Sequence, residues 1–234
     1  MSRIFLRVAA AVVAIAFVGK LIGSDDDLIP KQFSREQRGN ILRFLKDHEK
    51  PKQYIPRDAK IVGGQPGAAE KLPEVKEGQS VKQYLVQIMP HRPVPGQEEV
   101  RRVDVYYYRP SPVKGKPGVT IKHTLDVVTG KEIGTTEVLL NGNTPLAREE
   151  LAEAVDLAKN NFEPVKALYK RFDKDAIHWE FLQLTINKKQ ESLEPGDRAV
   201  MLTFTVTVPK DQTPPAPVRV IANVTKGNVT LAPH

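Results

Sequence analysis

Apolar and polar residues alternate along most of the chain after residue 80, and this period of two predicts β-strands. The clearest stretch is Ala199–Val208, where Val, Leu or Phe occupies every second position from 200 onward and threonines lie between most of them. The same alternation appears in further segments, namely 80–89, 100–108, 118–130, 131–141, 177–187 and 218–226. Gly130 predicts the turn of a β-hairpin. Strands with one dry and one wet face are typical of an antiparallel sheet.

A helical spacing replaces the alternation in segment 144–172, where apolar residues recur three and four positions apart. Thr144 is a suitable N-cap, and Pro145 suits the first helical position because its missing N–H costs nothing there. Asn160–Asn161 interrupts the pattern, and Pro164 can begin a second helix. The segment therefore predicts one long helix or two consecutive helices.

The first 24 residues predict export. An apolar run covers most of residues 4–23, with Arg7 and Lys20 near its ends and acidic residues 25–27 after it. Its length fits either a membrane anchor whose basic ends reach the two interfaces or the apolar region of a cleaved signal peptide. The charge asymmetry places the N-terminus in the cytoplasm and the remainder outside. Both alternatives stay open, and both predict an inner-membrane-anchored or secreted protein facing the periplasm or the cell exterior.

Residues 25–79 predict a short helix and a linker. Ser34 is a good N-cap for a juxtamembrane helix that ends before Pro51. The following residues, 51–79, carry Pro, Gly and charge without either period, which is typical of a linker or a strap along a surface.

Together these elements predict an α+β fold. We expect residues 80–234 to form a cystatin-like roll, in which one curved antiparallel sheet packs on the long or broken helix. Ala154 and Val155 would face that sheet, since both lie on the apolar stripe of the helix. Residues 1–24 would then be the signal peptide or single-pass anchor, and residues 25–79 the connection.

Segment 120–161 resembles the small N-terminal domains of copper amine oxidases. The similarity rests on a strand that ends in Asp-Leu-type and Gly-Lys residues, a return strand, and a Pro-Leu-x-x-Glu-Glu opening of a helix; the matching residues are Leu125, Asp126, Gly130, Lys131, Pro145, Leu146, Glu149, Glu150 and Ala154. In that family these domains are structural. The His-x-His ligand motif and the Asn-Tyr-Asp/Glu cofactor motif of the catalytic domain do not occur here. The resemblance therefore implies the fold without oxidase activity.

Composition narrows the function classes. With 234 residues, of which 40% are hydrophobic, the chain can build a sizeable core. The absence of cysteine excludes disulfides, thiolate nucleophiles and cysteine-bound metals. A net charge of +7 comes from 35 basic and 28 acidic residues without a Lys/Arg block, so we expect no nucleic-acid binding.

Candidate chemistry is sparse. The histidines are isolated in the sequence, and His123, on the apolar phase of its strand, is expected to be a satisfied core or edge residue. Glu149 and Glu150 are explained by the positive end of the helix dipole. Phosphate-binding loops and nucleophile elbows are lacking. The sequence therefore predicts no catalytic residue, no metal site and no cofactor, and hence a protein that is not an enzyme.

The most informative predicted surface is the wet face of segment 100–108, which carries Arg102, Asp104, Tyr106 and Tyr108. Tyr and Arg are enriched at protein interfaces. We therefore expect an exported, membrane-tethered accessory subunit that binds a protein partner, such as a larger membrane complex. The alternatives are tyrosines covered by the strap from Gln53 to Gln79, and a small-ligand carrier or enzyme with a pocket between helix and sheet.

Overall fold

The computed structural model describes residues 25–63, 72, 81–91, 101–140, 144–186, 189–190 and 192–232. The fold is α+β, as the sequence predicts, but its strands form two sheets. The expected membrane anchor or signal peptide, residues 1–24, lies outside the described residues. Among the described ranges, no helix combines the length and the hydropathy that crossing a bilayer requires.

The described residues between 25 and 140 form the first lobe, which contains a mixed sheet. Its strands follow the spatial order β1-β6-β4-β3-β2, with the short β5 paired to β4. All pairs are antiparallel except β1 with β6. The bounds are η1 Asp25–Leu28, α1 Arg35–Asp47, β1 Lys60–Val62, β2 Tyr84–Pro90, β3 Arg102–Arg109, β4 Val119–Asp126, β5 Lys131–Glu132 and β6 Glu137–Leu139.

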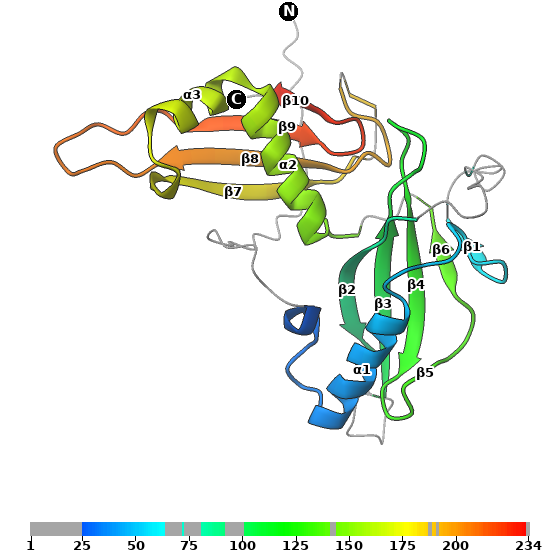
Figure 1. Ribbon diagram of the computed structural model, residues 1–234. Coiled ribbons are helices and arrows are strands. Elements are labelled where there is room, and N and C mark those ends of the chain that lie inside the picture. Colours follow the sequence, from blue (N-terminus) through cyan, green and yellow to red (C-terminus); the bar gives the residue numbers. More distant parts are fainter. Residues whose placement is uncertain are drawn as a thin grey trace, which may run out of the picture.

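Helix α1 covers one face of this sheet (Figure 1). Ser34 caps it, since the Ser34 hydroxyl accepts a hydrogen bond from the Gln37 N–H and the Gln37 side chain accepts one from the Ser34 N–H. Ile41, Phe44 and Leu45 are buried against the inward side chains of β3 and β4. The predicted juxtamembrane helix is therefore part of a folded lobe.

The described residues between 144 and 232 form the second lobe. Its sheet is an antiparallel meander in the order β10-β9-β8-β7, covered by α2 and α3. Pro164 lies in the first turn of α3, as predicted. The bounds are α2 Arg148–Asn161, α3 Glu163–Arg171, η3 Lys174–Ala176, β7 Ile177–Leu184, β8 Ala199–Val206, β9 Val218–Asn223 and β10 Asn228–Leu231.

The prediction of one sheet under one helical unit is wrong. The strands before residue 140 bury their apolar face under α1, and those after residue 176 bury theirs under α2 and α3. Gly39 lies within α1 and lowers its helix propensity. Gly39 is exposed and a Cβ there would touch nothing within 4 Å, so it costs α1 no packing.

The two lobes meet where the N-terminal end of α2 approaches the first sheet (Figure 1). Here a second prediction fails, since α2 begins at Arg148 and not at Pro145. The Thr144 hydroxyl does not cap the helix, because it interacts with Thr120 at 3.2 Å and with Arg198 at 3.2 Å. Segment 144–147 thus becomes the connection on which the lobe junction is built.

Candidate binding site between the two lobes

Tyr108 forms the floor of the junction on the face of β3 opposite α1. It is buried with Val86 and Ala147, and the guanidinium carbon of Arg198 lies 4.1 Å from the centre of its ring. The Tyr108 hydroxyl accepts a hydrogen bond of 3.1 Å from the Gly118 N–H. Burial raises the pKa of Tyr108 to about 12, so the side chain is a neutral wall at physiological pH.

Gly118 allows this close approach. A Cβ at this position would collide with the Arg109 carbonyl oxygen and would lie 2.7 Å from the Tyr108 hydroxyl oxygen. The chain therefore returns from the β3–β4 loop directly over Tyr108 only because residue 118 has no side chain.

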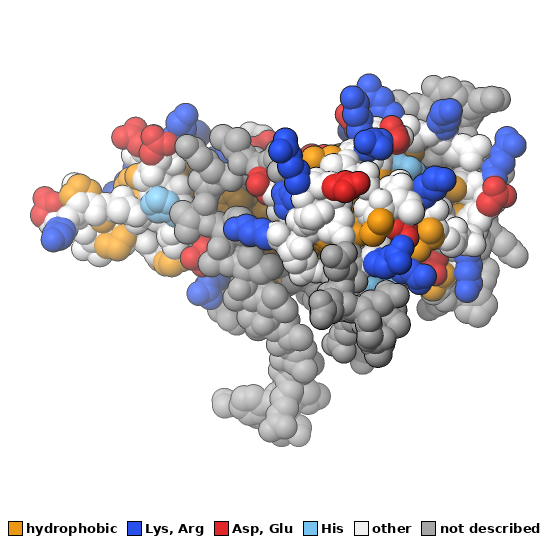
Figure 2. Space-filling model, turned by 90° about the horizontal axis from the view of Figure 1, so that it is seen from below, with side chains coloured by type: hydrophobic (Ala, Val, Ile, Leu, Met, Phe, Trp, Pro, Cys, Tyr) orange, Lys and Arg blue, Asp and Glu red, His pale blue; other side chains and the backbone are white. Residues whose placement is uncertain are grey.

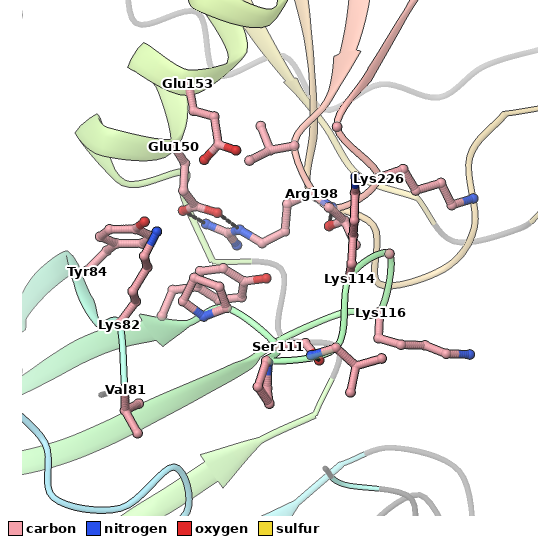
Figure 3. A pocket seen from close by; sticks show the side chains of 18 of the residues that line it. Val81, Lys82, Tyr84, Ser111, Lys114, Lys116, Glu150, Glu153, Arg198 and Lys226 are labelled. Atoms are coloured by element: carbon pink, nitrogen blue, oxygen red, sulfur yellow. Dashed lines mark hydrogen bonds and ion pairs between the residues drawn. The ribbon is translucent and has the colours of Figure 1, made fainter. Parts of the chain in front are cut away.

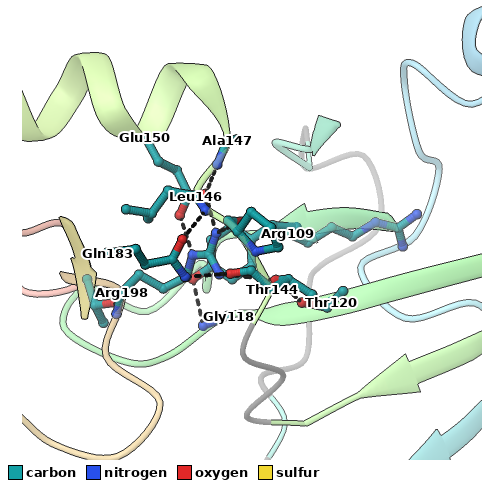
Figure 4. A network of polar contacts seen from close by, with 12 residues as sticks. Arg109, Gly118, Thr120, Thr144, Leu146, Ala147, Glu150, Gln183 and Arg198 are labelled. Carbon is teal, nitrogen blue, oxygen red and sulfur yellow. Dashed lines mark hydrogen bonds and ion pairs between the residues drawn. The ribbon is translucent and has the colours of Figure 1, made fainter. Parts of the chain in front are cut away.

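A buried ion pair joins the second sheet to α2 beside this tyrosine. Arg198 Nε and Nη2 each lie 2.6 Å from an oxygen of Glu150, which is 1% exposed. The remaining Arg198 donors reach the carbonyl oxygens of Thr144 at 3.1 Å and Pro145 at 2.7 Å (Figure 4). Such bidentate pairing fixes orientation as well as charge. The favourable interaction of Glu150 with the positive end of the helix dipole is therefore only part of its role. Its carboxylate also accepts a hydrogen bond from the Ala147 N–H at 2.8 Å.

Gln183 of β7 clamps the same connection from the other side. Its Nε2 donates to the Thr144 carbonyl oxygen at 2.8 Å, and its Oε1 accepts from the Leu146 N–H at 2.8 Å. The backbone at the junction is thus held by Gln183 of β7 and by Arg198, which directly precedes β8, and its geometry is fixed before any ligand arrives.

A cavity of about 470 Å³ opens beside the ion pair (Figure 3). Its volume falls within the range of about 300–1,000 Å³ that is usual for ligand sites. Both lobes line it. The first lobe contributes the β3–β4 loop and the residues leading into β2, and the second contributes α2 and the β9–β10 turn.

Basic residues outnumber acidic ones in the lining of the cavity, which includes the acidic Glu150 and Glu153 and the basic Lys82, Lys114, Lys116, Arg198 and Lys226. Lys226 is paired with Asp197 at 3.2 Å. Lys114 and Lys116, on the β3–β4 loop, are exposed, and the described residues form no ion pair with either. Lys82 is exposed as well, so the ammonium groups of Lys82, Lys114 and Lys116 give the cavity its available positive charge.

No comparable concentration of basic side chains is visible on the face shown in Figure 2. Lys and Arg side chains are scattered over it with acidic side chains among them. The charge pattern of that face fits the absence of a Lys/Arg block in the sequence.

The four residues predicted to form one exposed surface are separated. Arg102 is exposed, Tyr106 is half-buried, and Asp104 and Tyr108 are buried. The expectation that all four face solvent is wrong, because the second lobe covers the Tyr108 end of the strand. Arg198 of the second lobe covers the Tyr108 ring. Segment 53–79, the alternative cover in the sequence analysis, lies mostly outside the described residues.

Asp104 belongs to a separate polar cluster. His91 Nε2 lies 2.9 Å and Thr124 Oγ1 2.7 Å from Asp104 Oδ1, while Lys122 Nζ lies 3.3 Å from Oδ2. Burial opposes ionisation of Asp104, but these three partners outweigh it and hold its pKa below the usual value. Tyr106 reaches the same carboxylate at 3.4 Å, so it extends this cluster and not the cavity.

We expect Tyr108→Ser to destabilise the protein by about 3 kcal/mol or more, because it removes a buried ring from under Arg198. Tyr106→Ser should cost less than about 1.5 kcal/mol, since that ring is half-buried. Urea unfolding followed by circular dichroism measures both. Equal losses for the two variants would contradict the placement of Tyr108 at the junction.

The structure also brings together groups that the sequence analysis treats as isolated. His48, His123 and Glu132 offer one potential ligand atom each within 4.8 Å of one another. Neither this cluster nor the Arg198–Glu150 pair has a local sequence signal, because each joins residues from distant elements. The sequence indicates only that His123 lies on the apolar face of its strand, and His123 is buried in the structure.

The core under α2 and α3 is filled by apolar side chains of both helices and of the second sheet. The cavity at the junction therefore lies in a different place from the pocket between helix and sheet that the sequence analysis gives as an alternative.

Comparison with models of known protein families gives no match to this chain, and comparison with curated proteins gives no significant match.

Proposed function

We propose that the protein is an exported, membrane-tethered, non-catalytic accessory subunit that binds an acidic segment of a protein partner in the cavity between its lobes. The observation that carries this proposal is the pair of exposed lysines, Lys114 and Lys116, at a cavity of about 470 Å³. Carboxylates of a partner would complement these ammonium groups and would steer the encounter.

The preformed wall of the cavity supports a binding role. Arg198, Glu150 and Tyr108 already satisfy one another, so a ligand meets a rigid surface and loses little free energy in ordering it. Because the Arg198 donors are all engaged, recognition of charge falls to the lysines of the rim.

Export and tethering rest on the apolar N-terminal segment with its basic residues and the acidic run after it. We further propose that each lobe is a cystatin-like roll, since each combines an amphipathic helical unit with a largely antiparallel sheet. The resemblance to the N-terminal domains of copper amine oxidases points the same way and implies a structural role.

Charge reversal at the cavity tests the proposal. The full-length chain is used as bait in solubilised membranes, captured proteins are identified by mass spectrometry, and their affinities are then measured. Lys114→Glu with Lys116→Glu should weaken partner binding about tenfold or more, because two attractive contacts become repulsive. The matched control is Lys170→Glu with Lys174→Glu, which makes the same charge change at exposed positions that do not line the cavity.

Two results would count against different parts of the proposal. Unchanged partner affinity in the Lys114/Lys116 variant would remove the cavity as the binding site. Recovery of the full-length chain only from the cytosolic fraction would remove export and tethering.

A small anionic ligand is the second candidate, and the volume of the cavity favours it. The same variants distinguish the two. Binding of small carboxylates that is lost in the Lys114/Lys116 variant, without any captured protein, supports a ligand carrier over an accessory subunit.

A further inference from the structure

Three potential metal ligands converge where α1 ends over the first sheet. His48 is the C-cap residue of α1, His123 lies on β4, and Glu132 lies on β5, which pairs with β4. His123 Nδ1 is 2.7 Å from Glu132 Oε1, and His48 Nε2 is 3.8 Å from Glu132 Oε2. The tertiary structure has thus placed two imidazoles around one carboxylate.

The orientation of His48 is fixed. Its Nδ1 lies 2.9 Å from the Phe44 carbonyl oxygen, which can only accept, so Nδ1 carries a proton. The ring also stacks on Phe44, with 3.9 Å between ring centres. In the neutral imidazole, Nε2 is then a bare lone pair directed towards Glu132. A backbone carbonyl that holds the second nitrogen is the usual support of a metal-binding histidine.

In this state His48 Nε2 and Glu132 Oε2 are both hydrogen-bond acceptors, and they lie 3.8 Å apart. A lone pair opposite a carboxylate oxygen is unfavourable unless the ring nitrogen takes up a proton or a cation lies between the two atoms. The other ring nitrogen of His123, Nε2, is buried and has no hydrogen-bond partner among the described residues, so it is free to carry the ring proton when Nδ1 binds the ion.

We propose that His48 Nε2, His123 Nδ1 and a Glu132 oxygen bind a divalent transition-metal ion of the Zn²⁺ class. Two imidazoles and one carboxylate form a ligand set that Zn²⁺ accepts, with metal–ligand distances of about 2.0–2.2 Å. Tetrahedral ligands at such distances lie about 3.3–3.5 Å apart. The separations of 2.7 and 3.8 Å end on different oxygens of Glu132, and the three ligand atoms lie within 4.8 Å of one another, so binding of the ion requires movements of about an ångström.

Glu132 is the group able to make this adjustment. About one third of its side chain is exposed, and Thr136 Oγ1 supports it with a hydrogen bond of 2.8 Å to Oε1. Metal binding through Nδ1 moves the His123 ring proton to Nε2 and replaces the hydrogen bond to Glu132. The ion would tie the C-terminal end of α1 to the β4–β5 hairpin, so we assign it a structural role. This inference replaces the expectation, drawn from the sequence, that the chain holds no metal.

Zinc titration of the full chain, purified without a histidine tag and stripped with EDTA, tests the proposal. We expect one Zn²⁺ per chain by calorimetry and a tetrahedral absorption spectrum with Co²⁺. Zn²⁺ at about 100 times its Kd should raise Tm by several degrees. His48→Gln and Glu132→Gln should each weaken binding at least about 100-fold, the upper end of what loss of an outer partner costs.

The control variant is His178→Gln, which removes an exposed histidine from β7 and should bind Zn²⁺ like the wild type. Glu132→Gln retains an oxygen that can accept from Thr136 and His123, so its loss of affinity cannot be ascribed to unfolding, and circular dichroism verifies this. The proposal is overturned if the wild type binds no Zn²⁺, or if the His48 and Glu132 variants bind it as tightly as the control.

Discussion

Replacement of Arg198 with Met should destabilise the protein by about 3–5 kcal/mol, because it leaves the Glu150 carboxylate buried without its cation. Glu150 is 1% and Arg198 7% exposed, so water cannot replace the lost partner. The carbonyl oxygens of Thr144 and Pro145 lose donors at the same time. Urea unfolding of the wild type and the variant measures the change in the free energy of unfolding.

Two further variants test whether the unpaired Glu150 carboxylate causes the loss of stability. Glu150→Leu combined with Arg198→Met removes both charges and should recover part of the loss, since a buried pair costs most when only one member is removed. Arg219→Met removes an exposed arginine from β9 and should stay within about 0.5 kcal/mol of the wild type. A loss in Arg198→Met no larger than in Arg219→Met would show that the junction does not depend on the pair.

Val155→Asp should destabilise the second lobe by roughly 4 kcal/mol or more, because it buries a carboxylate among apolar side chains. Val155 is 4% exposed and lies in the core formed by α2, α3 and the second sheet. Since natural domains are stable by only about 5–15 kcal/mol, this variant should unfold at a much lower temperature. Thermal unfolding followed by circular dichroism measures the shift.

Asn160→Asp is the matched control, because it adds the same carboxylate at an exposed position of the same helix. It should cost no more than about 1 kcal/mol, the scale of an unfavourable charge near a helix C-terminus. If Val155→Asp melts within a degree or two of Asn160→Asp, the helix does not bury the face that contains Val155.

Local structure could be predicted from the sequence because it depends on periodicity. The alternation in Ala199–Val208 gives β8, and the three–four spacing gives α2 with Val155 facing inward, a prediction that is confirmed. The cap at Ser34 and the break before α3 were likewise readable, because each depends on one or two residues and their immediate neighbours.

Only the tertiary structure decided which elements pack together. The inward faces of β4 and β8 have the same pattern, and nothing in either strand says that one lies under α1 and the other under α2. Pairing of strands depends on contacts between distant segments, which periodicity does not encode. The sequence alone therefore could not show whether the strands form one sheet or two.

The same reason explains the sites. Tyr108 has the strand phase of a solvent-facing residue, and its burial comes from Arg198 of the other lobe. His48, His123 and Glu132 are unremarkable in sequence and meet only because α1 ends over the β4–β5 hairpin. A side chain's phase is determined by its own strand or helix, whereas its neighbours across the fold determine whether it meets water, a charge or another ligand atom.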